Sequence, residues 1–327
     1  MNKNIKVICT IGPATFQKKR LLELKKLKID LFRINLSHTK IEDLSKRIKS
    51  LQDLSINKIC VDTEGAQIRT TIVKKKQFKK NHIINFNFKK KNKGNNIGLY
   101  PKFNFSNLKT KAIISIGFEN LKLKVTQIKK NTFKAIVISS GFVESNKGVH
   151  VNKYIKLNGV TDKDIAAIKI ARNLKVKNFA LSFTNNKEDV INFRKLIGKN
   201  SDLISKIETK MALNNLSEII KNSNKILIDR GDLSRYVPIE RIPIVQMQIL
   251  KRANLMKKKC YVATNLLETM VQNDQPTRAE SNDIFSTLEK GADGLVLAAE
   301  TAMGNYPIEC VKFIKKCIQT YKNYKKN

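Results

Sequence analysis

The feature of this 327-residue chain that most restricts its fold is a repeated alternation of short apolar runs with amphipathic segments. A short apolar run bounded by turn residues is typical of a strand buried on both faces, and an amphipathic segment is typical of a surface helix. Eight such runs occur, at Ile5–Ile11, Asp30–Leu36, Lys58–Val61, Asn178–Phe183, Asp202–Ile207, Lys225–Ile228, Lys259–Ala263 and Gly294–Ala298. Eight strand–helix units in succession predict an α/β fold of the (β/α)8 type, the TIM barrel.

Helical patterns fill the intervals between most of these runs. They cover Lys19–Leu27, Ile41–Leu51, Thr161–Asn173, Ser217–Asn222 and Ile242–Met256. Thr161 is followed three residues later by Asp164, which predicts a capping box at the start of one helix.

The interval after the third run departs from this pattern. After Arg69 the chain alternates apolar and polar residues at Ile83–Phe88, Lys122–Ile128 and Thr132–Ser139, and no long helical pattern occurs. Alternation with a period of two predicts half-buried strands. We therefore predict a barrel of residues 1–69 and 157–327 and a small inserted β-rich domain of residues 70–156. The remaining barrel then has close to the roughly 250 residues that are usual for this fold.

The net charge of +37 and the isoelectric point near 10 would ordinarily suggest a nucleic acid or an anionic membrane as partner. However, 53 of the 64 basic residues are Lys, they are scattered along the chain, and Asn and Ile are also abundant. This is the composition that an AT-rich genome produces through codon usage. No nucleic-acid-binding motif accompanies it, so we expect no nucleic-acid partner. We interpret the Lys-rich segment Lys89–Asn96 as a solvated loop.

Membrane and disulfide signals are missing from the sequence. No apolar run reaches the roughly 18 residues of a spanning helix, and Met1–Gly12 does not have the pattern of a signal peptide. The cysteines number five, an odd number, and have no C-x-x-C spacing, which argues against a disulfide framework or a zinc site. We expect no membrane association and a reducing, cytoplasmic environment.

Polar residues follow most of the predicted strands. In this fold active sites form at the carboxyl ends of the strands. The residues in question are Arg33, Asn35, Ser37, His38, Asp62, Thr63, Ser182, Lys206, Glu208, Asp229, Arg230, Gly231, Asp232, Thr264, Glu300 and Thr301. Carboxylates on neighbouring strands, with Lys206 and Arg33 nearby, predict a site for a divalent metal and a phosphate. Taken singly, each residue could be a helix cap, a salt-bridge partner or part of a turn, but their joint occurrence favours a site.

Several continuous strings in the chain resemble the pyruvate kinase family. They are Lys6–Pro13, Phe32–His38, Ser205–Glu208, Arg230–Leu233, Ala263–Thr264, Leu267–Met270, Pro276–Glu280 and Glu300–Ala302, followed by Gly304 and Tyr306–Pro307. They occur in the family's order over nearly the whole chain.

The resemblance implies a role for each matching residue. It implies that the catalytic residues are Lys206, Arg33 and Thr264. It implies contacts to phosphoenolpyruvate from Arg33, Lys206, Ser182, Gly231, Asp232 and Thr264, the last three at the substrate's carboxylate. It implies that Mg2+ (or Mn2+) is held by Glu208 and Asp232, that K+ is held by Asn35, Ser37, Asp62 and Thr63, and that the nucleotide is contacted by Asn35, Arg69 and Lys147. Lys206 would neutralise charge on the transferring phosphoryl group, Arg33 would clamp the phosphate, and the insert would be a lid.

The sequence departs from the family's pattern at several positions. Glu64 replaces a Lys, and Gly117–Asn120 replaces an Asp-Asp-Gly turn of the lid. Asp229 replaces a small residue, Ser234 replaces a Gly, and Ala298 replaces a Ser implicated in proton delivery. We therefore expect an intact metal and phosphoenolpyruvate side and an altered nucleotide and proton-delivery side.

The activity implied by the resemblance is the last step of glycolysis, in which phosphoenolpyruvate and ADP give pyruvate and ATP. Two alternatives stay open: a phosphoenolpyruvate-using paralogue with an acceptor other than ADP, and a phosphoenolpyruvate-binding relative without turnover. Arg69 and Lys147 favour the first function, whereas Glu64 and the altered lid turn favour the alternatives. The sequence given ends at Asn327, just past the last predicted barrel helix. We therefore expect the family's C-terminal regulatory domain to be absent and the protein to be a monomer or a homodimer.

Overall fold

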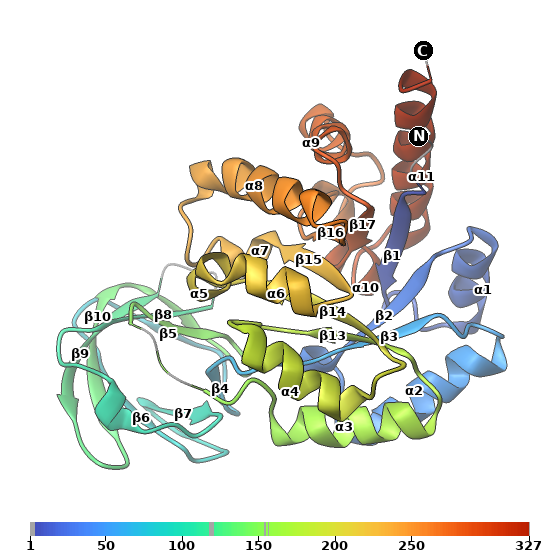
Figure 1. Cartoon of the computed structure of the whole chain (residues 1–327). Coiled ribbons are helices and arrows are strands. Elements are labelled where there is room, and N and C mark those ends of the chain that lie inside the picture. The colour runs from blue at the N-terminus through green and yellow to red at the C-terminus, as the bar shows by residue number, and fades with distance from the viewer. Residues whose placement is uncertain (1–3, 118–120, 154, 156, 327) are drawn as a thin grey trace. The chain divides into compact units, whose positions relative to one another are not determined.

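The computed structural model describes residues 4–117, 121–153, 155 and 157–326 (Figure 1). The chain divides into two compact units, one of Met1–Gly65 and Gly159–Asn327 and one of Ala66–Asn158. The boundaries between the units therefore lie at 65/66 and 158/159. The sequence pattern predicted them at 69/70 and 156/157. Of the departure from the family's pattern at Gly117–Asn120, residues 118–120 lie outside the described residues.

The first unit is a closed barrel of parallel strands, in the order β1-β17-β16-β15-β14-β13-β3-β2 (Figure 1). The strands are β1 (Lys6–Thr10), β2 (Leu31–Asn35), β3 (Ile59–Asp62), β13 (Asn178–Leu181), β14 (Asp202–Ile207), β15 (Lys225–Asp229), β16 (Lys259–Ala263) and β17 (Gly294–Leu297). Each of the eight predicted apolar runs forms one of these strands. The predicted (β/α)8 fold is confirmed.

Helices surround the strands of this unit (Figure 1). They are α1 (Lys18–Lys26), α2 (Ile41–Asp53), α3 (Asp162–Asn173), α4 (Lys187–Ile197), α5 (Lys210–Asn214), α6 (Leu216–Asn222), α7 (Arg230–Leu233), α8 (Ile242–Leu255), α9 (Arg278–Glu289), α10 (Ala299–Ala302) and α11 (Pro307–Tyr324). The predicted capping box opens α3. Thr161 Oγ1 accepts the N–H of Asp164 at 3.1 Å, and Asp164 Oδ2 accepts the N–H of Thr161 at 3.0 Å.

The barrel strands are apolar along their whole length because both of their faces are buried. On β1, Ile8 points into the barrel, whereas Val7 and Cys9 belong to the cluster that packs between strands and helices. The interior of the barrel is filled by Ile8, Leu31, Cys60, Ala180, Ile204, Leu227, Tyr261, Ala263 and Val296. A strand buried on both faces has no position for a solvated side chain, which explains why the sequence shows runs rather than alternation.

The second unit, among its described residues, is β-rich. Its larger sheet has the order β12-β8-β9-β10-β6-β7-β4, and β11 pairs with β5. The strands are β4 (Arg69–Thr70), β5 (Lys76–Phe78), β6 (Ile83–Asn87), β7 (Asn96–Tyr100), β8 (Ile113–Ile116), β9 (Lys122–Ile128), β10 (Phe133–Ser139), β11 (Gly141–Val143) and β12 (Val149–Val151). The three strands that alternation predicted are confirmed as β6, β9 and β10. The Lys-rich loop extends only to Asn95, since β7 begins at Asn96.

An aromatic core holds the second unit together. Phe86 stacks on Phe133 with ring centroids 4.5 Å apart, and Phe88 stacks on Phe105 at 4.3 Å. Phe86, Phe105 and Phe133 are almost fully buried. This unit therefore has a hydrophobic core of its own, separate from that of the barrel.

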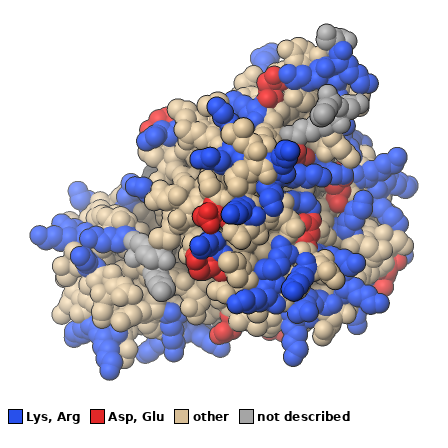
Figure 2. All heavy atoms as spheres, viewed as in Figure 1, with Lys and Arg blue, Asp and Glu red and all other residues tan. Residues whose placement is uncertain are grey.

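Basic side chains are frequent on the face shown in Figure 2. Figure 2 shows Lys and Arg spread over the visible face, with Asp and Glu in small groups between them. The basic residues on this face do not gather in one patch. Within the described residues, no helix combines the length and the apolar character that crossing a membrane requires. The five cysteines all carry free thiols.

Candidate active site

The ammonium group of Lys206 lies at the centre of a cluster of carboxylates at the carboxyl ends of the barrel strands. Its Nζ is 2.8 Å from Glu208 Oε1, 3.2 Å from Asp229 Oδ2 and 3.5 Å from Asp62 Oδ2. Burial alone would lower the pKa of Lys206, but the three carboxylates outweigh it and raise the pKa above the ordinary value for lysine. The three carboxylates therefore favour the protonated, positively charged form of Lys206.

Arg33 on β2 is fixed beside this cluster. Its Nε donates to Asp62 Oδ2 at 2.7 Å, its Nη2 lies 2.5 Å from the same oxygen, and its Nη1 donates to Thr10 Oγ1 at 2.8 Å. The side chain is only 7% exposed. Asp62 thus links the guanidinium group to the ammonium group of Lys206, and the two cations are held in one buried network. Two positive charges in fixed positions are suited to a phosphate group.

Three carboxylates of the barrel could share one metal ion. One oxygen each of Glu208, Asp229 and Asp232 lie within 4.8 Å of one another. Glu208 Oε2 accepts the N–H of Phe183 at 2.5 Å, and Glu208 Oε1 lies 2.8 Å from Lys206 Nζ. Burial also raises the pKa of Glu208, against the effect of Lys206. Hard carboxylate oxygens gathered at this spacing fit Mg2+ or Mn2+.

Asp229 was not among the metal ligands that the resemblance implied, and the structure places it within the carboxylate cluster. Besides Lys206, it contacts Thr264, whose Oγ1 donates to Asp229 Oδ1 at 2.7 Å. Burial opposes its ionisation, but Lys206, the hydrogen bond from Thr264 and the charge of Arg33 lower the pKa of Asp229 below the ordinary value. Asp229 is therefore a carboxylate anion inside the site. The departure from a small residue was visible in the sequence, but its contacts were not.

The four residues implied as K+ ligands lie around the ends of β2 and β3. Asn35 pairs in register with Asp62 on the neighbouring strand. Asn35 Oδ1 accepts the N–H of Ser37 at 3.0 Å, and Thr63 Oγ1 accepts the N–H of Ser182 at 2.9 Å. An oxygen that accepts one hydrogen bond keeps a lone pair for a cation. The donor set of hydroxyl, amide and carboxylate oxygens fits a hard monovalent ion.

Ser182 connects the K+ residues to Lys206. Its Oγ accepts a hydrogen bond from Lys206 Nζ at 3.2 Å and lies 2.8 Å from the carbonyl oxygen of Thr63 and 3.2 Å from Asp62 Oδ1. The loop after β3 passes close to this side chain, because a Cβ atom on Gly65 would come within 2.7 Å of Ser182 Cβ. Gly65 has a φ of +71°, a conformation that glycine adopts without strain.

Thr264 follows β16 in a strained conformation. Its φ is +78°, which is rare for a β-branched residue. Arg230 stabilises this turn, since its Nε and Nη2 donate to the carbonyl oxygen of Thr264 at 3.0 Å and 2.6 Å. Arg230 is itself anchored by Asp283 at 2.7 Å. The hydroxyl of Thr264 is therefore held in place next to Asp229.

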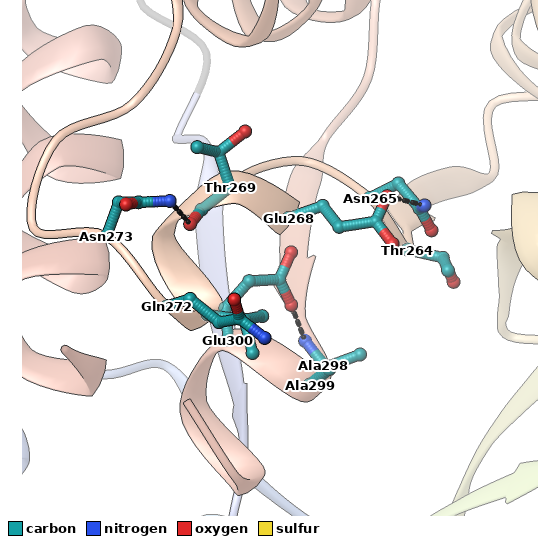
Figure 3. A pocket seen from close by; sticks show the side chains of 10 residues that line it. Thr264, Asn265, Glu268, Thr269, Gln272, Asn273, Ala298, Ala299 and Glu300 are labelled. Atoms are coloured by element: carbon teal, nitrogen blue, oxygen red, sulfur yellow. Dashed lines mark hydrogen bonds between the residues drawn. The ribbon is translucent and has the colours of Figure 1, made fainter. Parts of the chain in front are cut away.

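A pocket of about 510 Å3 opens beside Thr264 (Figure 3). Its lining residues come from the loops after β16 and β17 and are Thr264, Asn265, Glu268, Thr269, Val271, Gln272, Asn273, Ala298, Ala299 and Glu300. Glu300 ties the two loops together, because its carboxylate accepts the N–H of Ala298 at 2.7 Å and of Leu267 at 3.2 Å. Ala298 therefore contributes to the wall of the pocket, and it brings no hydroxyl group.

Glu64, which stands where the family commonly has a Lys, forms an ion pair with a neighbouring lysine. Its carboxylate lies 2.9 Å from Lys163 Nζ on α3. The backbone N–H groups of Glu64 and Gly65 donate to Asp164 at 2.7 Å and 3.1 Å, so the capping residue of α3 also fixes the loop after β3. The sequence predicted the cap of α3 but not this second role of Asp164.

The two implied nucleotide contacts in the second unit lie on neighbouring segments of it. Arg69 forms an antiparallel bridge with Gly148, and the N–H of Thr70 donates to the carbonyl oxygen of Lys147 at 2.9 Å. Arg69 Nη1 donates to the carbonyl oxygen of Asn146 at 3.2 Å, and Lys147 Nζ lies 3.2 Å from Glu144. Within that unit, the fold places two basic residues that are far apart in the sequence on neighbouring backbone segments.

A family model and several curated proteins that match this chain all carry the name of one family. The family model described as pyruvate kinase, barrel domain, matches residues 2–311. A protein named pyruvate kinase from Thermotoga maritima is 35% identical over 96% of this chain and 70% of its own length. Proteins of the same name from Clostridium perfringens and Bacillus licheniformis are 32% and 30% identical over 93% and 95% of the chain. The chain spans 67% and 56% of the lengths of those two relatives.

Proposed function

Since the chain belongs to the pyruvate kinase family, we propose that it transfers the phosphoryl group of phosphoenolpyruvate to ADP and releases pyruvate and ATP. The observation that carries this proposal is the buried network at the strand ends. Lys206 and Arg33 supply two fixed positive charges, and Glu208 and Asp232 would supply carboxylates for a divalent cation. Phosphoryl transfer depends mainly on such positioning and electrostatic stabilisation.

The residues of the chain have separate roles in this proposal. Arg33 orients the phosphate of phosphoenolpyruvate through its planar guanidinium group. Lys206, which stays protonated, neutralises the negative charge on the oxygens of the transferring phosphoryl group. The hydroxyl group of Thr264 donates a hydrogen bond to the substrate's carboxylate. A divalent cation held by Glu208 and Asp232 would neutralise charge on the substrate's oxygens.

The second unit supplies the nucleotide side of the proposed reaction. Arg69 and Lys147 are neighbours within that unit and would contact the phosphates of ADP. Asn35 would contribute to the same nucleotide contact from the barrel. Because Ala298 has no hydroxyl group, we propose that water in the pocket beside Thr264 delivers the proton that completes the methyl group of pyruvate.

Potassium dependence follows from the oxygens of Asn35, Ser37, Asp62 and Thr63. We expect turnover in K+ to exceed turnover in tetramethylammonium of equal ionic strength by at least about tenfold, which corresponds to about 1.4 kcal/mol of transition-state stabilisation. The measurement is the initial rate of pyruvate release in the two buffers. Equal rates would mean that these four oxygens bind no ion needed for the reaction.

A second candidate function is favoured by Ala298. Without the hydroxyl that the family commonly carries there, the barrel could bind phosphoenolpyruvate without completing the reaction, or transfer the phosphoryl group to another acceptor. The discriminating experiment follows pyruvate release with ADP, with other nucleoside diphosphates and without an acceptor. We expect release that requires a nucleoside diphosphate and is fastest with ADP. Release at the same rate without ADP, or none under any condition, would contradict the proposed function.

A further inference from the structure

Asp229 accepts a hydrogen bond from a group that the proposed reaction needs as a free donor. Thr264 Oγ1, the donor that the proposed function gives to the substrate's carboxylate, donates to Asp229 Oδ1 at 2.7 Å. The other oxygen of Asp229, Oδ2, lies 3.2 Å from Nζ of Lys206, which the proposed function places beside the transferring phosphoryl group. A carboxylate of the chain itself thus contacts two groups that the substrate would use.

The surrounding backbone keeps Thr264 close to Asp229. Arg230 holds the carbonyl oxygen of Thr264 with two hydrogen bonds, of 3.0 Å and 2.6 Å. On the other side, a Cβ atom on Gly231 would lie 2.9 Å from Thr264 Cγ2, so this side chain packs closely against the backbone that follows β15. Asp229 ends β15 and is buried, which leaves it little freedom to turn away while the loop stays in place.

Electrostatics oppose the entry of a second carboxylate at this point. Two carboxylates cannot both accept the single hydroxyl proton of Thr264, and like charges at short range repel each other in a buried site. An incoming substrate carboxylate must therefore displace Asp229 from Thr264 or remain without that hydrogen bond.

We propose that Asp229 acts as an internal competitor for the substrate's carboxylate, and that it lowers the affinity of the barrel for phosphoenolpyruvate. This inference rests on the proposed function, because it takes phosphoenolpyruvate as the ligand. It goes beyond that function because it attributes weaker binding of the substrate's carboxylate to one residue, Asp229. The competing ligand is the side chain itself, so the effect requires no other molecule.

The test is a calorimetric titration of the full chain with phosphoenolpyruvate at saturating Mg2+. Asp229→Ala should bind phosphoenolpyruvate at least about tenfold more tightly than the unmodified protein, or about 1.4 kcal/mol. Asp229→Asn, which keeps the shape and an acceptor but loses the charge, should show a smaller gain. The fold should survive, because Lys206 keeps Asp62 and Glu208 as partners.

The control variant is Asp202→Asn, which removes the same charge from the start of β14, where Asp202 pairs with Lys225. It should leave the affinity unchanged. A second arm introduces Thr264→Val, which removes the released donor: if the competition takes place at Thr264, the gain from Asp229→Ala should largely disappear in this background.

The outcomes separate this inference from the proposed function. If the unmodified protein binds phosphoenolpyruvate and Asp229→Ala binds it no more tightly, the inference is wrong and the proposed function stands. A gain that persists undiminished with Thr264→Val would also overturn the inference, since the donor would then lie elsewhere. If neither the unmodified protein nor Asp229→Ala binds phosphoenolpyruvate, both are contradicted.

Discussion

Replacing Lys206 by Met is expected to lower kcat by about 10²- to 10³-fold while changing the affinity for phosphoenolpyruvate much less. The magnitude is that of removing one preorganised electrostatic group from a buried site. The ammonium group lies within 3.5 Å of three carboxylates and is only 6% exposed, so its position is fixed before the substrate arrives. A charge that acts mainly on the transferring phosphoryl group stabilises the transition state more than the bound substrate, and its loss therefore appears in kcat.

The measurement is a steady-state comparison of kcat with the dissociation constant of phosphoenolpyruvate. Each carboxylate keeps another partner in this variant: Asp62 keeps Arg33, Glu208 keeps the N–H of Phe183, and Asp229 keeps Thr264. Circular dichroism should therefore show a folded protein. Lys225→Met is the matched control, because Lys225 pairs with Asp202 outside the cluster and should retain its rate. Losses of equal size in kcat and in affinity would show that Lys206 only binds the substrate and does not stabilise the transition state.

Replacing Glu208 by Gln should remove most of the Mg2+-dependent activity. The substitution takes away one anionic ligand of the proposed divalent site but keeps an amide oxygen that can accept the N–H of Phe183. A bound cation contributes several kcal/mol to charge stabilisation, and each 1.36 kcal/mol is a factor of ten, so a loss of about 10²-fold or more is expected. Independently of turnover, calorimetry should show weaker binding of Mn2+ to this variant.

Glu218→Gln serves as the control for this charge change. Glu218 lies exposed in the first turn of α6, and its replacement removes one negative charge from the same unit. Its activity and Mn2+ affinity should match those of the unmodified protein. Near-normal turnover of Glu208→Gln at low Mg2+ would show that the metal, if any, is held by other residues.

The strands of the barrel could be predicted because burial on both faces leaves a continuous apolar signature. All eight runs became strands, and the bounds differ only by one or two residues at their ends, where hydrogen bonding rather than composition sets the limit. The capping box of Thr161 and Asp164 was also predictable, since both residues lie within one turn. In contrast, the bonds from Asp164 to Glu64 and Gly65 join residues about a hundred positions apart, and no local pattern indicates them.

The candidate site was predictable in its membership but not in its connections. Strand-end position indicated Lys206, Glu208, Asp62 and Arg33, and the structure places these side chains in one network. The roles of these residues stay predictions. Asp229 was visible as a polar residue at a strand end and as a departure from the family's pattern, but not as a partner of Lys206 and Thr264. Its contacts depend on how β15 and the strained turn after β16 meet, which is a property of the tertiary fold.

The central claim is the transfer of a phosphoryl group from phosphoenolpyruvate to ADP, and phosphorus-31 magnetic resonance measures it directly. In a mixture of the protein with phosphoenolpyruvate, ADP, Mg2+ and K+, the phosphoenolpyruvate signal should decline while the γ-phosphate signal of ATP rises by the same amount. The signals should stay constant with Lys206→Met over the same time. Loss of the phosphoenolpyruvate signal with inorganic phosphate or another phosphate ester as product, or no change at all, would contradict the account.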